Sequence, residues 1–399
     1  MLSLAALSGR NDDRMKEQAG MTQDWVTQAE RWCFDIALPF WARNGLDRAD
    51  GGVQEALDLA GAPISGGFQR ARVAGRQLYV FSHAEVLGWA GARPVADGCY
   101  EALMQRFWRG TDKGFARRVR ADGGPLDDTP DLYDHAFVLF ALAWRYRATG
   151  DDAAKARLHQ TLDVIETLLT HPSGLGFAHE VPMALPRQQN PHMHLLEAAL
   201  AAFEATGEAR FQKLAADLVA LFQTRFFDRA SATLAEFFAD DWARAPGEAG
   251  RLVEPGHQFE WAWILARAQA LFGWPLGEDI GALVGFAEEN GVDPATGVTF
   301  NSVRDDGAPL DRGSRTWPNT ERIKGWLAMA EAHGVDPRPA VGQSCAVLFQ
   351  RYLNPAPAGG WIDAYDPAGA PLSTTIPAST LYHVFLAFAE MMRLKHLLK

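Results

Sequence analysis

The segment Phe137-Val-Leu-Phe-Ala-Leu-Ala-Trp144 is apolar around its whole circumference if it forms a helix. A helix that is hydrophobic on every side is buried on every side. The segment Phe385-Leu-Ala-Phe-Ala389 has the same character, whereas Asp151-Asp-Ala-Ala-Lys-Ala-Arg157 carries a polar stripe. The sequence therefore predicts two kinds of helix, one enclosed by the other.

Apolar residues recur at three- and four-residue spacing along most of the chain, which predicts helices. Tight breaks such as Thr149-Gly150-Asp151 and Gly273-Trp274-Pro275 alternate with connections of roughly 20 to 30 residues. The strongly apolar helices are the even-numbered members of this series. The twelve expected helices span residues 22–43, 67–91, 93–110, 131–148, 151–171, 191–206, 208–227, 257–273, 276–291, 320–334, 337–354 and 377–396.

The long connections repeat one turn signal that ends in proline, for example Asp122-Gly-Gly-Pro125 and Asp306-Gly-Ala-Pro309. Alternating residues such as Val298-Thr-Phe-Asn-Ser-Val303 predict short strands beside these turns. The corresponding prolines recur at nearly equal intervals, at positions 63, 125, 186, 246, 309 and 371. Six copies of one unit therefore fill the chain, each a helical hairpin with a small β-hairpin.

Six helical hairpins of equal size can stack as an open solenoid or close into a ring. Because the even helices are apolar nearly all round, we expect them to form an inner ring inside the odd helices. The prediction is an all-α fold, an (α/α)6 barrel, with one catalytic domain over residues 21–399. Residues 1–20 are expected to be a flexible N-terminal extension.

Composition excludes several classes of partner. The 399 residues include 38 Lys and Arg against 49 Asp and Glu, a formal charge of −11, and no concentrated basic face for nucleic acid is evident. No apolar stretch long enough to cross a bilayer is free of charge, so we expect no membrane span. Cys33, Cys99 and Cys345 are too few and too widely spaced for a disulfide framework or a zinc site. We expect a cytoplasmic monomer or homodimer.

Polar residues concentrate near the starts of the even helices, which meet at one opening if these helices run parallel inside a ring. Buried charges there are costly unless they are paired or used. The candidate site residues are Arg76, Tyr133, Asn190, His194, Glu197, His257, Glu260, Trp317, Glu321 and His383.

His194-Leu-Leu-Glu197 and His257-Gln-Phe-Glu260 share the pattern His-x-x-Glu and are separated by the length of one repeat. In each pair the two side chains share a helix face. Three roles stay open for them: each Glu only orients its His, the two pairs bind two metal ions, or the imidazoles transfer protons while a carboxylate relays or polarises.

His383 favours proton transfer, without metal or cofactor, because it stands at an equivalent depth of the last even helix. The other histidines lack that placement, except His135 and His192, which are intermediate. We expect structural or exposed roles for His83, His159, His171, His179, His333 and His396.

Two further functions are compatible with this pattern. Glu197 with Glu260 or Glu321 would suit glycoside hydrolysis, and tryptophans near the opening would suit the apolar face of a sugar ring. A noncatalytic sugar-binding toroid also stays open. Three histidines at the opening argue against the glycosidase.

Five blocks occur along the chain in a fixed order: Gly75-Arg-Gln-Leu-Tyr-Val-Phe-Ser82, Asn190-Pro-His-Met-His-Leu-Leu-Glu-Ala198, Pro255-Gly-His-Gln-Phe-Glu-Trp-Ala-Trp263, Thr316-Trp-Pro-Asn-Thr-Glu321 and Thr380-Leu-Tyr-His383. Together they resemble the signature segments of the N-acylglucosamine 2-epimerase family. The resemblance implies an (α/α)6 barrel that isomerises or epimerises a monosaccharide at C2 without a required metal.

The resemblance also implies roles for individual residues. Arg76 would bind substrate oxygens and stabilise an enediolate. His383 would take the C2 proton and, in an isomerase, return it to C1, while His257 or Glu260 moves a proton between O1 and O2. In an epimerase His257 would instead reprotonate C2 from the other face. His194 completes the acid/base set, and the remaining candidates would bind the sugar.

The block Asp131-Leu-Tyr-Asp-His-Ala-Phe137 is more similar to the mannose isomerase branch, and Thr316-Trp317 replaces a tryptophan doublet typical of the epimerases. We therefore expect an aldose-ketose isomerase acting on D-mannose to give D-fructose. Two alternatives belong to the same class of enzyme: a mannose 6-phosphate isomerase and a sugar 2-epimerase. A phosphorylated substrate would need a basic pocket, for which the candidates are Arg187, Arg312, Arg315 and Arg322.

Overall fold

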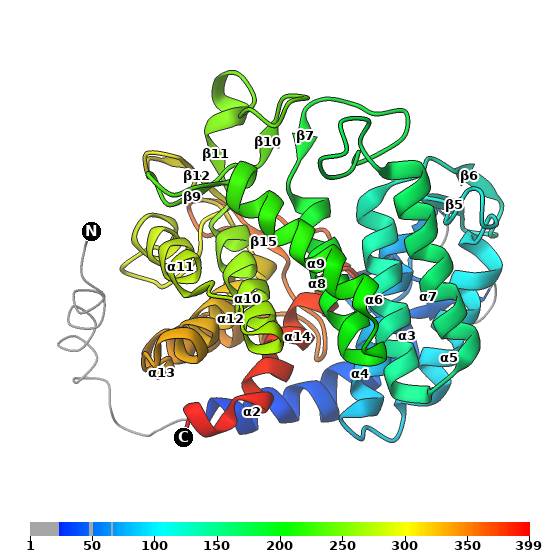
Figure 1. Cartoon of the computed structure of the whole chain (residues 1–399). Helices are drawn as coiled ribbons and strands as arrows, with labels where there is room; N and C mark the ends of the chain where they lie inside the picture. The colour runs from blue at the N-terminus through cyan, green and yellow to red at the C-terminus, as the bar shows by residue number, and fades with distance from the viewer. Residues whose placement is uncertain (1–23, 48–50, 65–66) are drawn as a thin grey trace.

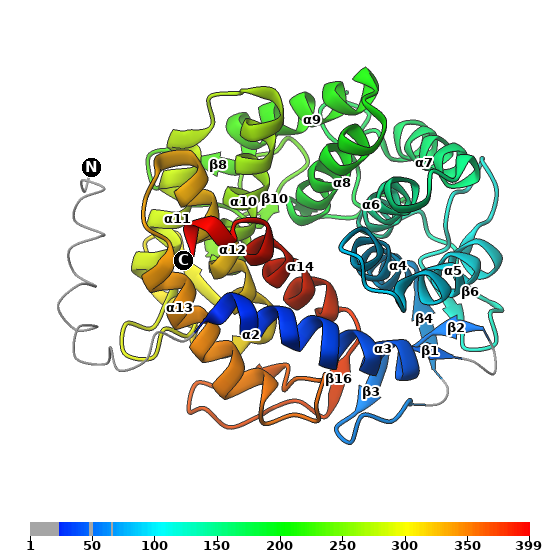
Figure 2. The same cartoon turned by 90° about the horizontal axis from the view of Figure 1, so that it is seen from below.

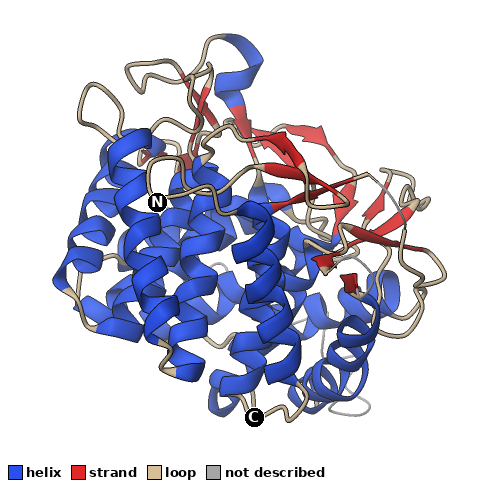
Figure 3. Ribbon diagram, turned by 90° about the vertical axis from the view of Figure 1, so that its right-hand side faces the viewer, coloured by secondary structure: helices blue, strands red, loops and turns tan. Residues whose placement is uncertain are grey.

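The computed structural model describes residues 24–47, 51–64 and 67–399, and the extension expected over residues 1–20 lies outside them. The helices form two concentric layers around a common axis (Figures 1 and 2). The strands gather at one end of the helices (Figure 3). We refer to that end as the mouth of the ring.

The inner layer consists of the six even-numbered helices of the sequence pattern. Each packs against its neighbours around the ring, and the last packs against the first, so the ring is closed. The fold is therefore the expected (α/α)6 barrel. The inner helices are α4 (Ala71–Val86), α6 (Leu132–Thr149), α8 (Asn190–Thr206), α10 (Pro255–Phe272), α12 (Thr316–His333) and α14 (Thr380–Arg393).

The outer layer consists of the odd-numbered helices, and all but one of them contain a π-helical segment. Two short 3-10 helices, η5 (Gly247–Arg251) and η7 (Lys395–Leu397), belong to neither the inner nor the outer layer. The outer segments are α2 (Trp25–Arg31) with η1 (Trp32–Ala37) and α3 (Leu38–Asn44), α5 (Ala92–Ala102) with η2 (Leu103–Phe107), α7 (Asp152–Val164) with η3 (Ile165–Leu169), α9 (Ala209–Leu221) with η4 (Phe222–Phe226), α11 (Gly277–Gly291), and α13 (Arg338–Val347) with η6 (Leu348–Leu353).

Helix boundaries differ from expectation mainly at the mouth. The helix expected from residue 67 begins at Ala71, and the one expected from residue 377 begins at Thr380, because strands occupy the residues before them. The helix expected from residue 320 begins earlier, at Thr316. Backbone pairing at the mouth therefore overrides the local helical pattern.

The tight breaks between inner and outer helices have a common geometry. Four inner helices end at a glycine with φ between 66° and 72°, a left-handed conformation that costs glycine no Cβ clash. These residues are Gly150, Gly207, Gly273 and Gly334.

The short strands link one unit to the next around the mouth. The strand that precedes an inner helix pairs antiparallel with a strand of the following unit, as in β4 with β5, β7 with β10, β11 with β12, and β14 with β15. Before α6 the same position is a single bridge between Asp131 and Glu180. The strands are β1 (Leu46–Asp47), β2 (Gly52–Val53), β3 (Ala56–Asp58), β4 (Phe68–Arg70), β5 (Arg118–Arg120), β6 (Pro125–Asp127), β7 (Arg187–Gln188), β8 (Phe227–Asp228), β9 (Thr233–Leu234), β10 (Phe237–Phe238), β11 (Leu252–Val253), β12 (Ser302–Arg304), β13 (Pro309–Asp311), β14 (Ser314–Arg315), β15 (Ala364–Tyr365) and β16 (Thr375–Pro377).

The last unit is joined to the first by the same kind of pairing. β16, which precedes α14, pairs with β3, so that Ile376 lies opposite Leu57. Below this seam the Trp41 ring stacks on Trp361, with centroids 5.1 Å apart, and its Nε1 donates to the Gly359 carbonyl at 2.9 Å. Ring closure is therefore built from backbone pairing and a buried tryptophan pair.

The three cysteines are buried and free, which leaves their thiols as core packing groups. Within the part of the chain that the structure describes, no helix has the length and apolarity required to span a bilayer.

Candidate active site

The candidate residues come from the first turns of the inner helices and meet at the mouth. Trp317 contacts both His257 and His383, with ring centroids 5.0 and 5.5 Å apart. Tyr382 contacts both His194 and His383, at 6.2 and 4.7 Å. The three histidines therefore surround one small region, although they lie on α8, α10 and α14.

All three histidines are held in the same way. The Nδ1 atom of each faces a carboxylate oxygen: Glu197 at 3.1 Å from His194, Glu236 at 2.9 Å from His257, and Glu321 at 2.8 Å from His383. Among the described residues, no Nε2 atom of the three has a hydrogen-bond partner. A carboxylate on Nδ1 fixes the ring and leaves Nε2 for proton exchange with a bound molecule.

The two intermediate histidines are held differently. Nδ1 of His135 and of His192 lies against a backbone carbonyl, and Nε2 of each accepts a backbone N–H, from Phe115 and Phe177 respectively, at 3.0 Å. Both nitrogens are thus used by the fold. His135 and His192 therefore support the long connections and are not available for chemistry.

His383 and His257 have opposite protonation tendencies. Burial, reinforced by the charges of Arg76 and Lys324, holds the pKa of His383 well below its usual value, so this imidazole is neutral. Burial also acts to lower the pKa of His257, but the charges of Glu236 and Glu254 outweigh it and raise the pKa to about 9. The site therefore contains a neutral imidazole beside a protonated one.

His194 forms a third arrangement with Glu197 and Tyr382. The Tyr382 hydroxyl donates to Glu197 at 2.6 Å, on the carboxylate that also faces His194. Burial lowers the pKa of His194 to about 3 and raises the pKa of Glu197 to about 7. His194 is therefore neutral as well, and its Nδ1 is held by Glu197.

Arg76 supplies a positive charge on the wall of the same region. Its guanidinium donates to the Tyr133 hydroxyl at 2.8 Å and lies over the Phe137 ring, 4.1 Å from its centroid. Arg76 Nε is buried without a hydrogen-bond partner. A cation packed between aromatic rings keeps a fixed position and stays free to meet a developing anion.

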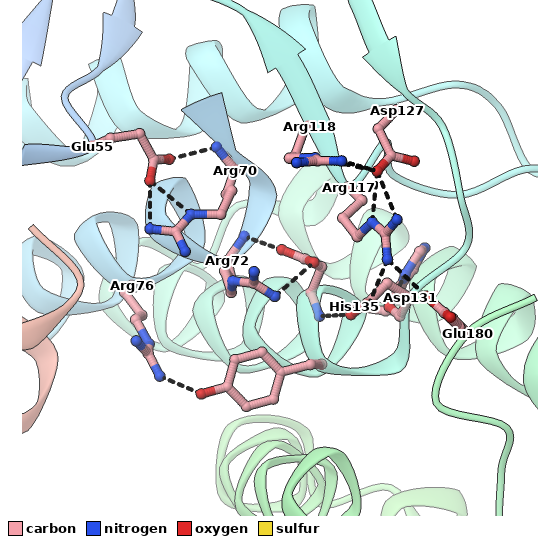
Figure 4. A network of polar contacts seen from close by, with 12 residues as sticks. Glu55, Arg70, Arg72, Arg76, Arg117, Arg118, Asp127, Asp131, His135 and Glu180 are labelled. Atoms are coloured by element: carbon pink, nitrogen blue, oxygen red, sulfur yellow. Dashed lines mark hydrogen bonds and ion pairs between the residues drawn. The ribbon is translucent and has the colours of Figure 1, made fainter. Parts of the chain in front are cut away.

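An ion-pair network fixes the strands and helix starts beside Arg76 (Figure 4). Arg70 in β4 pairs with Glu55, and the backbone N–H of Arg72 donates to Asp134 in α6 at 2.7 Å. Arg117 joins Asp127 and Glu180, which lie on different units. The network thus fixes the N-terminal ends of α4 and α6. Arg76 lies in the second turn of α4, and Tyr133 lies in the first turn of α6.

Asn190 is the one predicted site residue that no contact connects to the others. It is the first residue of α8, and its Oδ1 is buried without a partner among the described residues. An unsatisfied buried acceptor at the mouth is compatible with sugar binding, but the geometry does not join it to the histidines.

The two His-x-x-Glu pairs share a sequence pattern but differ in their contacts. Glu197 does orient His194, whereas His257 is held by Glu236, and both Glu260 oxygens lack a hydrogen-bond partner. The cation next to Glu260 is Lys324, whose Nζ lies 3.7 Å from Oε1. Sequence patterns did not identify Glu236, which follows a short loop strand, or Lys324.

The described part of the chain contains two sets of three side chains that could bind a metal ion. One is Glu236, Glu254 and His257, and the other is Glu260, Glu321 and His383; within each set the possible ligand atoms lie within 4.8 Å of one another. Neither set joins the two His-x-x-Glu pairs, so a dinuclear site of those four residues does not fit the geometry. In the first set the two carboxylates favour a proton on His257, which a metal ion would have to displace. The second set already holds the Lys324 ammonium, 2.6 Å from Glu321.

Two of the four arginines considered for a phosphate pocket are used by the fold. Arg187 is buried and donates to the Asp240 carbonyl, and Arg322 is buried and paired with Glu288 on an outer helix. Arg312 is exposed beside Phe300. Arg315 remains at the mouth, 5.3 Å from the Trp317 ring centroid and paired with Glu254 at 3.4 Å.

A separate cavity of about 430 Å³ opens toward the C-terminal ends of the inner helices. Its wall includes Glu197 and Trp263, but none of His194, His257 and His383. The cavity therefore opens away from the histidine cluster and reaches its inner side at Glu197.

Comparison with known proteins agrees with this fold. The model of the N-acylglucosamine 2-epimerase (GlcNAc 2-epimerase) family matches residues 51–387. The chain is 36% identical over 376 residues to a mannose-6-phosphate isomerase of Rhizobium meliloti, covering 90% of this chain and 95% of that one. It is 29% identical over 282 residues to a D-mannose isomerase of Thermobifida fusca, covering 65% and 68%.

The cellobiose 2-epimerase of Bacillus thermoamylovorans has the same fold, with a TM-score of 0.84, 22% identity and coverage of 92% of this chain and 98% of that chain. The fold and the relatives together define a sugar isomerase or 2-epimerase built on an (α/α)6 barrel. The chain belongs to the N-acylglucosamine 2-epimerase family. The glycosidase and the noncatalytic toroid are thereby set aside.

Proposed function

We propose that the enzyme is an aldose-ketose isomerase that converts D-mannose to D-fructose by histidine acid/base catalysis. The observation that carries the proposal is the pair of imidazoles with opposite protonation, His383 neutral and His257 protonated, each held through Nδ1 by a carboxylate. Removal of a proton next to a carbonyl requires a base at the carbon and an acid at the oxygen.

In the proposed reaction, His257 first assists opening of the pyranose ring. Nε2 of His383 then takes the proton from C2, the C1–C2 double bond forms, and the negative charge that develops on O1 is stabilised by Arg76. A proton moves from O2 to O1 through His257 or Glu260. His383 finally returns its proton to C1, which leaves the carbonyl at C2.

Two features favour isomerisation over epimerisation. A neutral base beside a protonated imidazole would serve either reaction, because an epimerase also removes the C2 proton with one group and returns it with another. The relatives at 36% and 29% identity are named isomerases, and Thr316 stands where the epimerases have the first tryptophan of a doublet. The carboxylates around His257 hold it in the protonated form, which in an isomerase suits proton transfer between oxygens.

Mannose 6-phosphate is the second candidate substrate. The relative from Rhizobium meliloti is named for that substrate, and Arg315 supplies a cation at the mouth. A phosphate on C6 would lie far from the reacting carbons, so the same acid/base residues would serve either sugar.

Proton NMR in deuterated water tests these alternatives. Mannose that yields fructose with deuterium at C1 supports the proposal, and glucose as the first product would show epimerisation instead. A rate that is much higher with mannose 6-phosphate than with mannose would identify the phosphorylated sugar as the substrate. Absence of exchange with either sugar would contradict the proposal.

A further inference from the structure

Lys324 is a buried cation that lies directly beneath the proposed catalytic residues. It is fully buried on α12, one turn after Glu321, and no other lysine of the described residues is buried in this way. Its Nζ lies 2.6 Å from Glu321 Oε2 and 3.7 Å from Glu260 Oε1. The Trp263 ring, 4.2 Å away, covers it on another side.

Glu321 therefore has one partner for each oxygen. Oε1 faces Nδ1 of His383 at 2.8 Å, and Oε2 faces the Lys324 ammonium. Lys324, Glu321 and His383 form a continuous chain of polar contacts from the interior of the ring to its mouth. The Lys324 ammonium also lies 5.8 Å from the centroid of the Tyr382 ring.

The Lys324 ammonium favours the ionised form of Glu321 by direct contact. Glu197, Glu260 and Glu321 are three buried carboxylates in one neighbourhood, and burial disfavours their ionised forms. Burial and the charge of Glu260 raise the pKa of Glu321 well above its usual value, and the ammonium, 2.6 Å away, limits this rise. Without the ammonium the rise would be larger, and a proton would bind to the Glu260 and Glu321 pair.

The protonation of Glu321 in turn decides the tautomer of His383. An ionised carboxylate can only accept, so Nδ1 carries the hydrogen and Nε2 has a free lone pair. A protonated Glu321 would donate to Nδ1, and the hydrogen of the neutral ring would then sit on Nε2. That tautomer cannot accept a proton from C2 of a sugar.

We propose that Lys324 is a positioning residue that keeps Glu321 ionised and thereby holds His383 in the tautomer with a free Nε2. The inference rests on the proposed role of His383 as the carbon base. Lys324 touches no substrate in this scheme and acts entirely through Glu321. Its ammonium provides the positive charge that the cluster of Glu260, Glu321 and His383 would otherwise draw from a metal ion.

The test compares Lys324→Met with the wild-type enzyme in the deuterium exchange assay, using the sugar that the wild type converts. We expect kcat at neutral pH to fall about 10- to 100-fold, since a misplaced base forfeits much of the 10² to 10⁴ that acid/base catalysis supplies. KM should change little. The deficit in kcat should shrink as pH rises, because Glu321 then ionises without the ammonium.

Nitrogen NMR on histidine-labelled protein reports the tautomer directly. The His383 signals are assigned by their absence in His383→Asn. In Lys324→Met we expect the hydrogen to move from Nδ1 to Nε2 of this residue alone. Wild-type kcat, or an unchanged tautomer, in Lys324→Met would overturn the inference.

Two further variants keep the test decisive. In a Glu321→Gln background, Lys324→Met should cause no additional loss of kcat, because the residue through which it acts is already neutral. If Lys324→Met does not fold, Lys324→Gln is used in its place. Arg322→Met is the control for loss of a buried cation from the same helix, and it should lower stability without altering the His383 tautomer.

The same experiment separates this inference from the proposed function. If His383→Asn retains exchange, the role of His383 as base fails. If His383→Asn is inactive while Lys324→Met is normal, only the role of Lys324 fails.

Discussion

Nδ1 of His383 lies 2.8 Å from Oε1 of Glu321, although the two residues are 62 positions apart in the chain. The contact joins α14 to α12, so it exists only when neighbouring units are assembled in the ring. The His194–Glu197 contact, in contrast, lies within one turn of α8. The proposed base therefore depends on packing between neighbouring units, which the His194–Glu197 contact does not require.

Replacement of His383 by Asn should abolish deuterium exchange while the protein stays folded. Because acid/base groups contribute roughly 10² to 10⁴ in rate, the loss of exchange should be of that order. Exchange is followed by proton NMR, and folding by circular dichroism and thermal melting. His192→Asn is the control: it breaks buried hydrogen bonds to the backbone, so it should cost about 1–3 kcal/mol of stability and leave proton exchange by the folded protein largely intact. An active His383→Asn variant would require another base.

The pH dependence of kcat/KM should show an alkaline limb near pH 9, where His257 loses its proton. In Glu236→Gln the limb should move to lower pH by about one unit or more, because loss of a neighbouring anion lowers the pKa of a cationic acid. A limb that stays near pH 9 in this variant would show that it does not report His257.

The same proton on His257 contributes to folding stability. Because the pKa is raised from 6.5 to about 9 in the folded state, the contribution is complete below pH 6.5 and is lost as pH rises through about 9. Urea unfolding at pH 7 and at pH 10 should show a smaller difference in Glu236→Gln than in the wild type.

Treatment with EDTA should leave the exchange rate unchanged. The reason is that the Lys324 ammonium already neutralises Glu260 and Glu321, and that the two His-x-x-Glu pairs do not converge on one point. The measurement is the rate before and after dialysis against chelator, with a zinc-dependent enzyme treated in parallel to show that chelation worked. A loss that a divalent ion restores would return the metal site to consideration.

Trp41→Ala should destabilise the ring at its seam by about 3–5 kcal/mol, the range for truncating a buried aromatic residue. Trp41 is fully buried and stacks on Trp361 of the last unit. The free energy of unfolding is measured by urea titration, and Trp41→Phe, which keeps a ring but loses the hydrogen bond to Gly359, should cost less. A loss below about 1 kcal/mol in Trp41→Ala would mean that closure does not depend on this contact.

Much of the fold follows from patterns that recur once in every unit. Fully apolar stretches such as 137–144 identified the inner helices, and the prolines at 125 and 309 marked the β-hairpins between units. The start of α4 was misplaced because strand pairing between β4 and β5 is a long-range effect that local periodicity does not contain.

The site was predictable where chemistry repeats along the inner helices. His194, His257 and His383 stand at equivalent depths, and the structure gathers them beside Trp317 and Tyr382. Their carboxylate partners were harder to predict, because Glu236 reaches His257 from the long connection before α10, 21 residues earlier in the chain. Lys324 did leave a signal, since it is three residues after Glu321 on an otherwise buried helix and so faces the same way.

The pairing of β16 with β3 fixes how this architecture can change over evolutionary time. An open array of helical hairpins can gain or lose a member at either end and still bury its core. Here the final hairpin already has its neighbour, so an inserted or deleted hairpin would leave two ends that no longer meet. New substrate preferences are therefore expected from changes in the helix starts and connections around the opening, while the count of six hairpins stays constant.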